Sequence, residues 1–554
     1  MKTTQPETRL PFHALPILIL GLVTVIYTWP LLSRLTVAVP GRFELTDTTE
    51  TVWSIGWMHA ALSQGGDIWH TDRLFYPFGA DLRFNVFGSL QGLMAFPFVA
   101  LLGVVGASNL VIILTMFLNG VFAYLLVWKH TDHETAALLA STCHILSLVV
   151  VWHFSAGRNA LPAVWVVSAS LLFLRSLLKS PSAWNGFLFG SSLILALFTD
   201  LQVALFACMW ALLYAVAYFS GDGIKLLRPL IVPFLIAITM FTVASAVVLS
   251  PAISLMNQVG FPVPTLDNVA FYAFPISDFV SPARIPFIYG FDFLLFAILA
   301  VVLFRWRGVY RFWLVGSLIF LLLSLGPYLK PTQLPLPYAL ASLWPPLLNF
   351  RAVYRFAIPA TLGLTLVTGY ALASLLPRTP IKGVAFLACM VFICLRLAYT
   401  IHVQPFETQV YPEYAFYSDI ARDTEDYVIL EIPFGIRSGF DQIGQGGERL
   451  QYYQAIHGKK ILNGSLARLP SSLFDFYRTH PLLLFFSGDP SVDRSRLGED
   501  FLDVLTWTKA RYILVHGSLL TFEQAFEIES FLAGQERVTR IGVEDDLVIY
   551  RVTP

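Results

Sequence analysis

The feature that most constrains this chain is a series of apolar runs, each close to the length of about 20 residues that an α-helix needs to cross a bilayer. Twelve such runs lie before about residue 402, at residues 15–35, 90–105, 110–128, 135–152, 161–178, 184–198, 203–219, 229–249, 287–304, 312–325, 356–376 and 384–401. Repeated runs of this kind predict a polytopic α-helical membrane protein with about 11–13 transmembrane helices.

The composition agrees with a membrane protein. Hydrophobic residues make up 56% of the 554 residues, charged residues only 13%, and the mean hydropathy is +0.67. The 36 basic and 36 acidic residues cancel and form no basic cluster, which excludes nucleic-acid binding. The cysteines lie inside apolar runs without the spacing of a zinc site, so we interpret them as buried apolar side chains: Cys143, Cys208, Cys389 and Cys394.

Basic residues in the short connections predict the orientation of the spans, because cytoplasmic loops are enriched in Lys and Arg. They mark four loops as cytoplasmic: Arg175 and Lys179; Lys225 and Arg228; Arg305, Arg307 and Arg311; Arg378 and Lys382. The loops near 155–159, 200–202, 252–286 and 328–355 then face outward, as does the chain after about residue 402. The sequence thus predicts a transmembrane domain, 1–402, and an extracytoplasmic α/β domain, 403–554.

The N-terminal run follows Lys2 and Arg9 without an evident cleavage site, which favours a retained signal anchor and a cytoplasmic N-terminus. Residues 90–128 must then make one net crossing, although they are long enough for two. We expect a break among the small and polar residues at 103–109 to resolve this conflict.

A long polar loop, residues 37–88, follows the first span. It contains Asp47, Glu50, Trp53 and Trp57 in the sequence ELTDTTETVWSIGW. Carboxylates that bind hydroxyls or accept a proton, beside rings that cover the apolar face of a pyranose, are typical of sugar-handling sites. Tryptophan also gathers at headgroup depth in interfacial helices. The residues alone favour a sugar site and an interfacial anchor equally.

A second candidate site lies in the predicted outer loop 328–355. Arg351 and Arg355 flank Tyr354, and on a helix the two arginines would project from one side. Guanidinium forks suit a phosphate or diphosphate, whereas snorkelling at the start of a span is the structural alternative. Another candidate is Asp278, in the outer loop 252–286, which is rich in proline and aromatic residues.

After residue 403 the charge rises and strand-like runs appear at 427–432, 511–516 and 546–551, with a helical stretch at 521–532. We interpret His457 as structural, because no Ser or Cys nucleophile motif accompanies it. Within the spans, we expect His144 to be hydrogen-bonded inside the bundle and Arg396 to snorkel to the outer surface. No P-loop or hydrolase motif is present, so nucleotide-driven transport and ordinary hydrolysis lose support.

Three pieces of the sequence resemble the GT-C superfamily of integral membrane glycosyltransferases, which includes protein O-mannosyltransferases, aminoarabinose transferases and the bacterial YfhO-like proteins. The first is the outer loop with its early acidic residue, Asp47. The second is HTDRLFYPFGADLRF, which leads into a span. The third is LSLGPYLK followed by LPLPYALASLWPPLLNFRAVYRF, then a span and an outer domain that contains YYQAIHGKKILNG. The resemblance covers nearly the whole chain.

The resemblance implies roles for these residues. Asp47 is the implied general base for an acceptor hydroxyl, and Glu50 is an orienting partner or a metal ligand. Arg351 and Arg355 would hold the phosphate of a polyprenyl-phosphate sugar, and Trp53 and Trp57 would line the sugar or acceptor site. GT-C enzymes place paired acids in this loop, whereas this chain has Asp-Thr-Thr-Glu, so the resemblance implies no certain cofactor and leaves a divalent metal open.

The function expected from the resemblance is transfer of a sugar from a polyprenyl-phosphate donor to an extracytoplasmic glycan, lipid or protein. The expected location is a bacterial plasma membrane. Two alternatives stay open: a non-enzymatic lipid or polysaccharide transporter or envelope assembly scaffold of the same fold, and a membrane-anchored binding protein. A carboxylate facing a cavity at membrane height favours the transferase, and a continuous polar path across the bundle favours transport.

Overall fold

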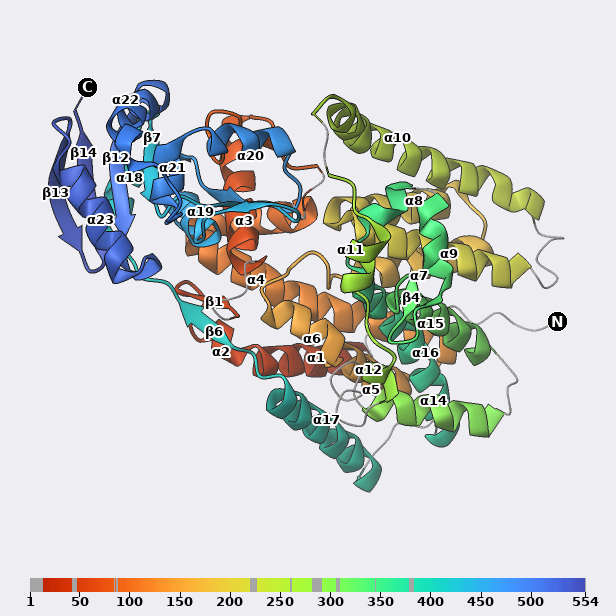
Figure 1. Ribbon diagram of the computed structural model, residues 1–554. Helices are drawn as coiled ribbons and strands as arrows, with labels where there is room; N and C mark the ends of the chain where they lie inside the picture. The colour runs from red at the N-terminus through yellow and green to blue at the C-terminus, as the bar shows by residue number, and fades with distance from the viewer. Residues whose placement is uncertain are drawn as a thin grey trace, which may run out of the picture. The chain divides into compact units, whose positions relative to one another are not determined.

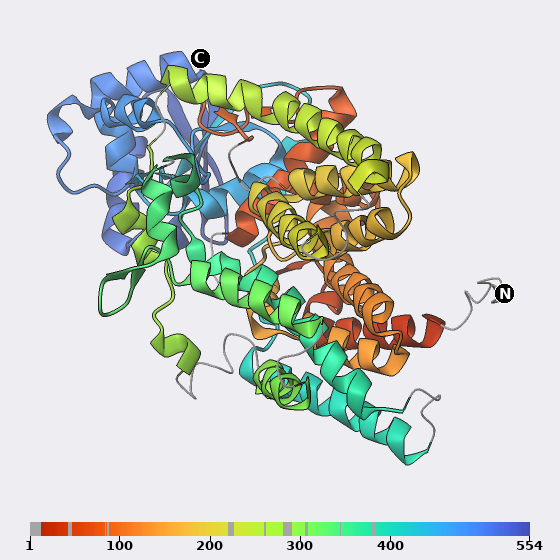
Figure 2. The same cartoon turned by 90° about the vertical axis from the view of Figure 1, so that its right-hand side faces the viewer.

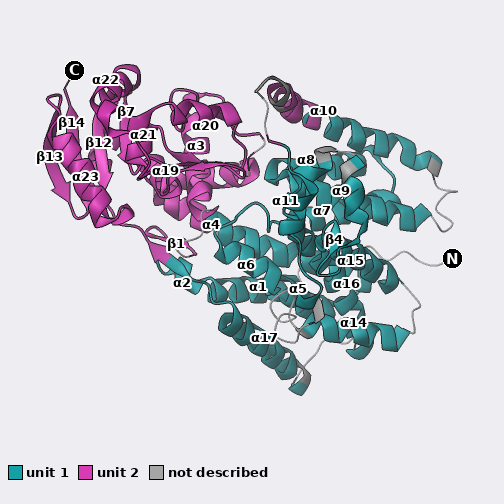
Figure 3. Cartoon of the chain, viewed as in Figure 1, with its two compact units in different colours: residues 1–34, 110–244, 263–408 teal, residues 35–109, 245–262, 409–554 magenta. Residues whose placement is uncertain are grey.

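The structure, a computed structural model, describes residues 13–41, 47–83, 85, 88–219, 227–259, 262–280, 291–304, 309–343, 345–377 and 383–553. The chain divides into two compact units (Figure 3). Unit 1 consists of residues 1–34, 110–244 and 263–408, and unit 2 of residues 35–109, 245–262 and 409–554. Packing therefore groups most of the predicted outer loop with the C-terminal residues. The division into a membrane part, 1–402, and an outer part, 403–554, stays a prediction.

Unit 1 is built from α-helices and short 3-10 helices (η) (Figures 1 and 2). They are α1 Ala14–Tyr27, α2 Trp29–Leu32, α5 Glu134–Ile145, α6 Leu148–Ser155, α7 Trp165–Lys179, α8 Ala183–Thr199, α9 Leu201–Phe219, α11 Leu266–Phe271, α12 Ser277–Val280, α14 Phe291–Phe304, α15 Tyr310–Ser324, η3 Pro337–Leu343, η4 Pro345–Asn349, η5 Val353–Phe356, α16 Ala357–Leu375 and α17 Val384–Val403. Strands β4 Tyr328–Leu329 and β5 Leu334–Pro335 form an antiparallel pair. Two helices, α4 Ser89–Thr131 and α10 Leu227–Val259, have residues in both units.

Within the described part of the chain, five helices are long and apolar enough to cross a membrane, and six if the bent pair α5 and α6 counts as one span. The five are Ser89–Thr131, Leu201–Phe219, Arg228–Leu255, Val353–Leu375 and Phe386–Val403. Shorter apolar helices of 10–17 residues include α1, α8, α14 and α15. A polytopic helical membrane protein is thus confirmed, while the number of 11–13 spans stays a prediction.

Helix α16 belongs to the most buried of the five candidate spans. It packs against α5, α14 and α15, and nearly all of its side chains are enclosed. Gly363 permits the close contact with α15, because a Cβ here would collide with the Ser317 hydroxyl and the Trp313 carbonyl. Small residues at such contacts are how helices cohere in lipid. Tyr354 and Arg355 lie in η5, directly before α16, so the tightly packed α16 helix fixes their position.

The expected break in residues 90–128 lies at Gly103. Helix α4 runs over 43 residues, but Gly103 adopts φ 69° and ψ 175°, a backbone conformation that separates two helical segments. A positive φ of this kind is readily adopted only by glycine. The sequence prediction of a broken segment is therefore confirmed.

The structure confirms the prediction for His144 and contradicts the prediction for Arg396, the two ionisable residues that the sequence analysis named within the spans. His144 is fully buried and its Nδ1 lies 3.1 Å from the Thr365 hydroxyl, as expected for a histidine inside the bundle. The prediction that Arg396 snorkels is wrong. Its Nε donates to Asp292 Oδ2 at 2.9 Å, and only 5% and 10% of the two side chains are exposed. Because the Asp292 carboxylate compensates the positive charge of Arg396 inside the bundle, the guanidinium does not need to extend to water.

Unit 2 contains a five-stranded sheet with helices around it (Figure 1). Its strand order is β10-β7-β12-β14-β13, with β10, β7 and β12 parallel and the other pairs antiparallel. The strands are β7 Val428–Ile432, β10 Lys460–Ile461, β12 Ala510–His516, β13 Val538–Glu544 and β14 Leu547–Val552. The three predicted strands correspond to β7, β12 and β14, and the predicted helix to α23 Phe522–Ala533, so this part of the α/β prediction is confirmed.

The remaining elements of unit 2 are short apart from the helix in the first loop, α3 Asp47–Gln64. They are β1 Ala38–Pro40, β2 His70–Thr71, β3 Ala80–Asp81, β6 Thr408–Val410, α18 Ala415–Arg422, β8 Ile436–Arg437, β9 Gln442–Ile443, α19 Gly447–His457, β11 Gly464–Ser465, α20 Ser471–Arg478, α21 Pro481–Phe486, η6 Arg494–Arg496, α22 Leu497–Thr508 and η7 Gly517–Leu519. Strand β1 pairs with β6, β2 with β3, and β8 with both β9 and β11.

The orientation prediction rests partly on basic residues that lie outside the described residues, namely Lys225, Arg305, Arg307, Arg378 and Lys382. The orientation of the spans and the extracytoplasmic side of the C-terminal residues therefore stay predictions.

Candidate functional site

Unit 1 contains a cavity of about 380 Å³ at which two predicted outer loops, 252–286 and 328–355, meet the end of the predicted span 135–152. Trp152 comes from α6, Tyr272 and Asp278 from the segment 262–280, and Tyr354 from η5. The Tyr354 ring lies parallel to that of His153 at 6.2 Å between centroids, and the Phe274 ring contacts it edge-on at 5.7 Å. Two of the predicted site residues, Asp278 and Tyr354, are thus brought together at one cavity.

Arg158 lies beside this cavity and was not identified from the sequence. Its guanidinium lies 5.1 Å from the ring centroid of Trp152, and its Nη1 donates to His153 Nδ1 at 2.7 Å. Arginine has no acceptor, so Nδ1 of His153 must carry the lone pair and a neutral His153 must hold its proton on Nε2. His153 is buried, and it therefore fixes the direction of the guanidinium. The sequence did contain one signal for Arg158: it is a basic residue in the loop 155–159, which the charge pattern predicts to face outward.

The two predicted arginines differ in their surroundings. Arg351 precedes η5 and its guanidinium lies 5.3 Å from the ring centroid of Tyr272. Arg355 lies 5.9 Å from the ring of Tyr354, and its Nη1 donates to Gln202 Oε1 at 3.3 Å. They do not share one face of an α-helix, because the chain between them is a 3-10 turn. Both guanidinium groups nevertheless contact aromatic rings that line the same cavity.

Asp47 and Glu50 occupy the first turn of α3, in unit 2. Residues three apart are neighbours on a helix surface, so the two carboxylates share one side of the helix end. The positive end of the helix dipole favours negative charge there. Both residues are partly exposed. The structure therefore places the two predicted catalytic acids together, as the sequence pattern indicates.

The tryptophans of α3 pack against the rest of unit 2. Trp53 is only 1% exposed, and its indole Nε1 donates to Gln454 Oε1 of α19 at 2.6 Å. Trp57 is partly buried, stacks parallel to Trp53, and donates to the carbonyl of Ile68 at 3.1 Å. Trp53 thus anchors α3 to α19 in place of the predicted contact with a sugar, while the sugar contact of Trp57 stays a prediction.

Two of the sequence pieces that carried the resemblance are joined in unit 2. The backbone N–H of Ile461 donates to the carbonyl of Arg73 at 2.9 Å, and that of Tyr76 donates to the carbonyl of Ile461 at 3.1 Å. Lys460 Nζ lies 3.2 Å from Asp72 Oδ2. The segment HTDRLFYPFGADLRF therefore docks along the end of YYQAIHGKKILNG, although nearly 400 residues separate them.

His457 belongs to a buried polar cluster, as expected for a structural histidine. Its Nδ1 accepts from the backbone N–H of Lys459 at 3.1 Å, and its Nε2 lies 3.6 Å from Glu431 Oε1. Tyr417 and His516 complete the cluster at 2.9 and 2.9 Å from the Glu431 carboxylate. Burial lowers the pKa of His457 to about 3 and raises that of Tyr417 well above its usual range. Hydrogen bonds inside the fold hold Tyr417, Glu431, His516 and Nδ1 of His457, which is typical of a structural role, whereas Nε2 of His457 makes no hydrogen bond to any residue that the structure describes.

The described residues around Asp47 and Glu50 fit a divalent metal ion poorly. Asp47 and Glu50 supply two carboxylates, and the described residues contain no group of three or more His, Cys, Asp or Glu arranged to hold a metal ion. No step of the reaction below is therefore assigned to a metal.

Comparison with protein-family models finds no match, and no curated protein sequence matches either. Solved structures do match. The chain superposes over its full length on the arabinofuranosyltransferase AftD from Mycobacteria, with a TM-score of 0.59 and 15% identity. It also matches ArnT from Cupriavidus metallidurans over 97% of both chains, with a TM-score of 0.51 and 11% identity, in a structure bound to undecaprenyl phosphate.

The match to ArnT in the apo state is similar, with a TM-score of 0.50 and 12% identity over 97% of this chain. The chain spans 42% of the length of AftD, so the match concerns one part of that protein. At these identities the comparisons show the fold. The expectation from the sequence is confirmed: this protein has the fold of the GT-C superfamily of integral membrane glycosyltransferases.

Proposed function

We propose that this protein is a glycosyltransferase that moves a sugar from a polyprenyl-phosphate donor to an extracytoplasmic acceptor. The observation that carries the proposal is the set of arginines around the unit 1 cavity: Arg158, Arg351 and Arg355 each contact an aromatic ring that lines it. Guanidinium groups bind phosphate oxygens in a fork, and the neighbouring rings suit the apolar part of a lipid-linked sugar. The GT-C fold supports this choice, since ArnT in a solved structure binds undecaprenyl phosphate.

The phosphate of the donor is the leaving group. The acceptor hydroxyl oxygen attacks the anomeric carbon, the bond from that carbon to the phosphate oxygen breaks, and polyprenyl phosphate departs with the electron pair. Arginines that neutralise the charge developing on the phosphate lower the barrier. His153 and Gln202 act as positioning residues, because they hold the guanidinium groups of Arg158 and Arg355.

The hydroxyl proton needs an acceptor as the new bond forms. We assign this role to Asp47, with Glu50 as its orienting partner on the same turn of α3. A carboxylate can remove a proton from a hydroxyl whose acidity rises during attack. The assignments of the arginines and of Asp47 are separate, and each has its own test. Inversion at the anomeric carbon is the outcome expected from the superfamily resemblance.

The test compares wild type with Asp47→Asn for transfer of radiolabelled sugar from a panel of polyprenyl-phosphate sugars to membrane acceptors. We expect the substitution to lower the transfer rate by a factor of about 100 or more at unchanged protein level, since a general base contributes about 10²–10⁴. Glu50→Gln should lower it less. Asp67→Asn, which alters an exposed acid in a turn outside α3, is the matched control and should transfer normally.

Equal transfer by wild type and Asp47→Asn would remove Asp47 from the mechanism and leave Glu50 and Asp278 as candidates. No transfer from any donor in the panel would contradict the enzymatic proposal and favour a transporter or assembly scaffold of the same fold.

A further inference from the structure

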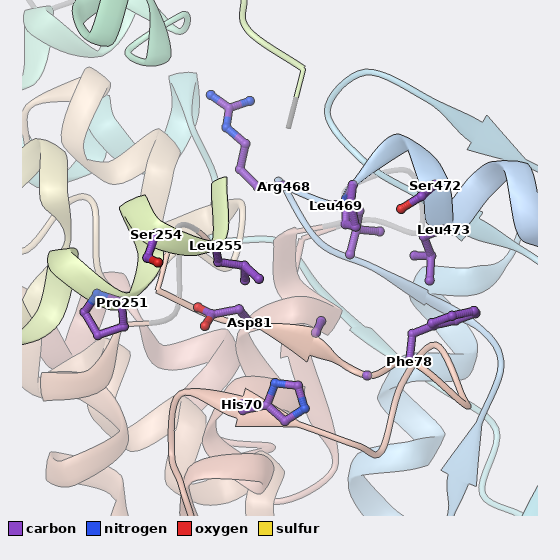
Figure 4. Close-up of a pocket in the computed structure, with 13 residues that line it drawn as sticks. His70, Phe78, Asp81, Pro251, Ser254, Leu255, Arg468, Leu469, Ser472 and Leu473 are labelled. Carbon is purple, nitrogen blue, oxygen red and sulfur yellow. The ribbon is translucent and has the colours of Figure 1, made fainter. Parts of the chain in front are cut away.

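Unit 2 contains a cavity of about 560 Å³ that the roles assigned above do not use (Figure 4). Three segments line it: the β2–β3 hairpin, the end of α10 that belongs to unit 2, and the chain entering α20. Ligand pockets have volumes of about 300–1,000 Å³, so this cavity is of suitable size for a small ligand.

The hairpin presents an aromatic ring to the cavity. Phe78 is 49% exposed although it is a large apolar side chain. The Phe476 ring holds it edge-on, with centroids 4.8 Å apart and an interplanar angle of 78°. The contact holds the ring in place, and about half of the side chain stays accessible. A held ring with an accessible face is what stacks on the apolar side of a pyranose or furanose.

Polar side chains line the same cavity. Asp81 is nearly enclosed, with 9% of its side chain exposed, and its carboxylate accepts from the backbone N–H of Arg83 at 2.9 Å. The guanidinium of Arg83 also pairs with it, so the carboxylate is fixed and compensated yet keeps lone pairs for hydroxyl donors. His70 and Ser472 line the same cavity and add groups that both donate and accept.

Backbone geometry maintains this arrangement. Gly79 has φ +68°, and a Cβ there would collide with the carbonyl of Thr71 in the paired strand. Only glycine lets the hairpin close with Phe78 and Asp81 on either side. Leu255 and Pro251 of α10 supply apolar surface to the cavity (Figure 4).

The combination favours a carbohydrate over a lipid tail. An acyl chain in this cavity would remove water from Asp81 and His70 without offering hydrogen bonds, which is costly for polar groups. A sugar offers hydroxyls to these groups and a C–H face to Phe78. We propose that the unit 2 cavity binds the glycan acceptor as an oligosaccharide, an inference that rests on the proposed transferase function.

The experiment uses the full chain in lipid nanodiscs. The probes are soluble linear mannose and arabinofuranose oligosaccharides of two to six sugars, and their affinity is measured by titration. We expect at least one probe to bind wild type, Phe78→Ala to weaken binding at least tenfold, and Ser472→Trp, which fills the cavity from an exposed position, to abolish it. Phe522→Ala, an 89% exposed phenylalanine of the same unit outside the cavity, is the matched control and should bind as wild type.

Failure of binding and failure of the transferase proposal are distinguishable. With transfer established, Phe78→Ala should raise the KM for the acceptor and leave the KM for the donor unchanged. Transfer that proceeds while no probe binds, or while both cavity variants retain wild-type affinity and acceptor KM, overturns the acceptor site and leaves the transferase intact. Binding that the cavity variants lose, in a protein that transfers no sugar, keeps the glycan site and removes its role as an acceptor site.

Discussion

Arg396 of α17 and Asp292 of α14 form an ion pair inside unit 1, with 2.9 Å between Nε and Oδ2. Both terminal nitrogens of the guanidinium donate as well: Nη1 to Thr400 Oγ1 at 2.7 Å and Nη2 to the carbonyl of Leu146 at 2.8 Å. One side chain thus links α14, α17 and the junction of α5 and α6. Additional hydrogen bonds of this kind are what make a buried ion pair tolerable.

Removing one partner of this pair should destabilise the protein strongly. Arg396→Met leaves the Asp292 carboxylate buried without a cation, at a cost of about 3–5 kcal/mol. The double variant Arg396→Met with Asp292→Leu removes both charges and should recover most of that loss. The measurement is resistance to thermal unfolding in detergent for both single variants and the double variant. A double variant no more stable than Arg396→Met would contradict the pairing.

The hydrogen bond from Trp53 to Gln454 predicts a coupled effect on stability. Gln454→Leu leaves the buried indole N–H without an acceptor, which costs about 1–3 kcal/mol. Adding Trp53→Phe removes the stranded donor and should return part of the lost stability. A thermal-unfolding cycle of the two singles and the double measures this coupling. Strictly additive losses would show that α3 does not depend on this bond.

The arginines near the unit 1 cavity should act on the donor. Arg158→Lys and Arg355→Lys keep the charge but lose the fork, a loss of about 1.5–3 kcal/mol for a charge-assisted hydrogen bond, or about 10–100-fold in apparent KM for the donor. The KM for the acceptor should not change. Arg422→Lys is the matched control, since its side chain is 79% exposed in unit 2. A shift in the acceptor KM alone would contradict the phosphate role.

His457 predicts a loss of stability in mild acid. Burial lowers its pKa from 6.5 to about 3, with Lys459, Arg73 and His516 adding in the same direction. The Glu431 carboxylate 3.6 Å away opposes this shift, but loss of water dominates. Below pH 6.5 the unfolded chain binds a proton that the folded chain does not, so stability falls as pH drops towards 3. The loss amounts to about 2 kcal/mol between pH 7 and pH 5.

The measurement for His457 is the apparent melting temperature of the full chain between pH 7 and pH 5. His457→Asn keeps an acceptor near the position of Nδ1 and should flatten the dependence on pH. His402→Gln, which alters an exposed histidine, should leave the slope unchanged. An unaltered slope in His457→Asn would show that another group is responsible.

The sequence predicts the parts of this fold that local pattern determines. Runs of β-branched and apolar residues predicted β7, β12 and β14, and the apolar lengths predicted the helical membrane architecture. Gly103 could be expected to interrupt its helix because the backbone conformation there is adopted readily by glycine alone.

Contacts between distant residues were beyond such reasoning. Asp292 lies within an apolar run, and nothing in the sequence indicates that it pairs with Arg396. Trp53 could be recognised as an aromatic beside acids, but its partner Gln454 lies 401 residues away, and only the fold reveals that the indole is enclosed. Arg158 lies only five residues after His153, but it was missed because its contacts with His153 and Trp152 depend on the turn at Gly157 that follows α6.

The most direct test of the central claim is the stoichiometry of transfer by the purified protein. With a polyprenyl-phosphate sugar labelled in both parts, the proposal predicts one molecule of free polyprenyl phosphate for each sugar attached to an acceptor, and no release without acceptor. Sugar that crosses the membrane while still linked to its lipid phosphate, with no phosphate released, would contradict the claim and identify the protein as a transporter.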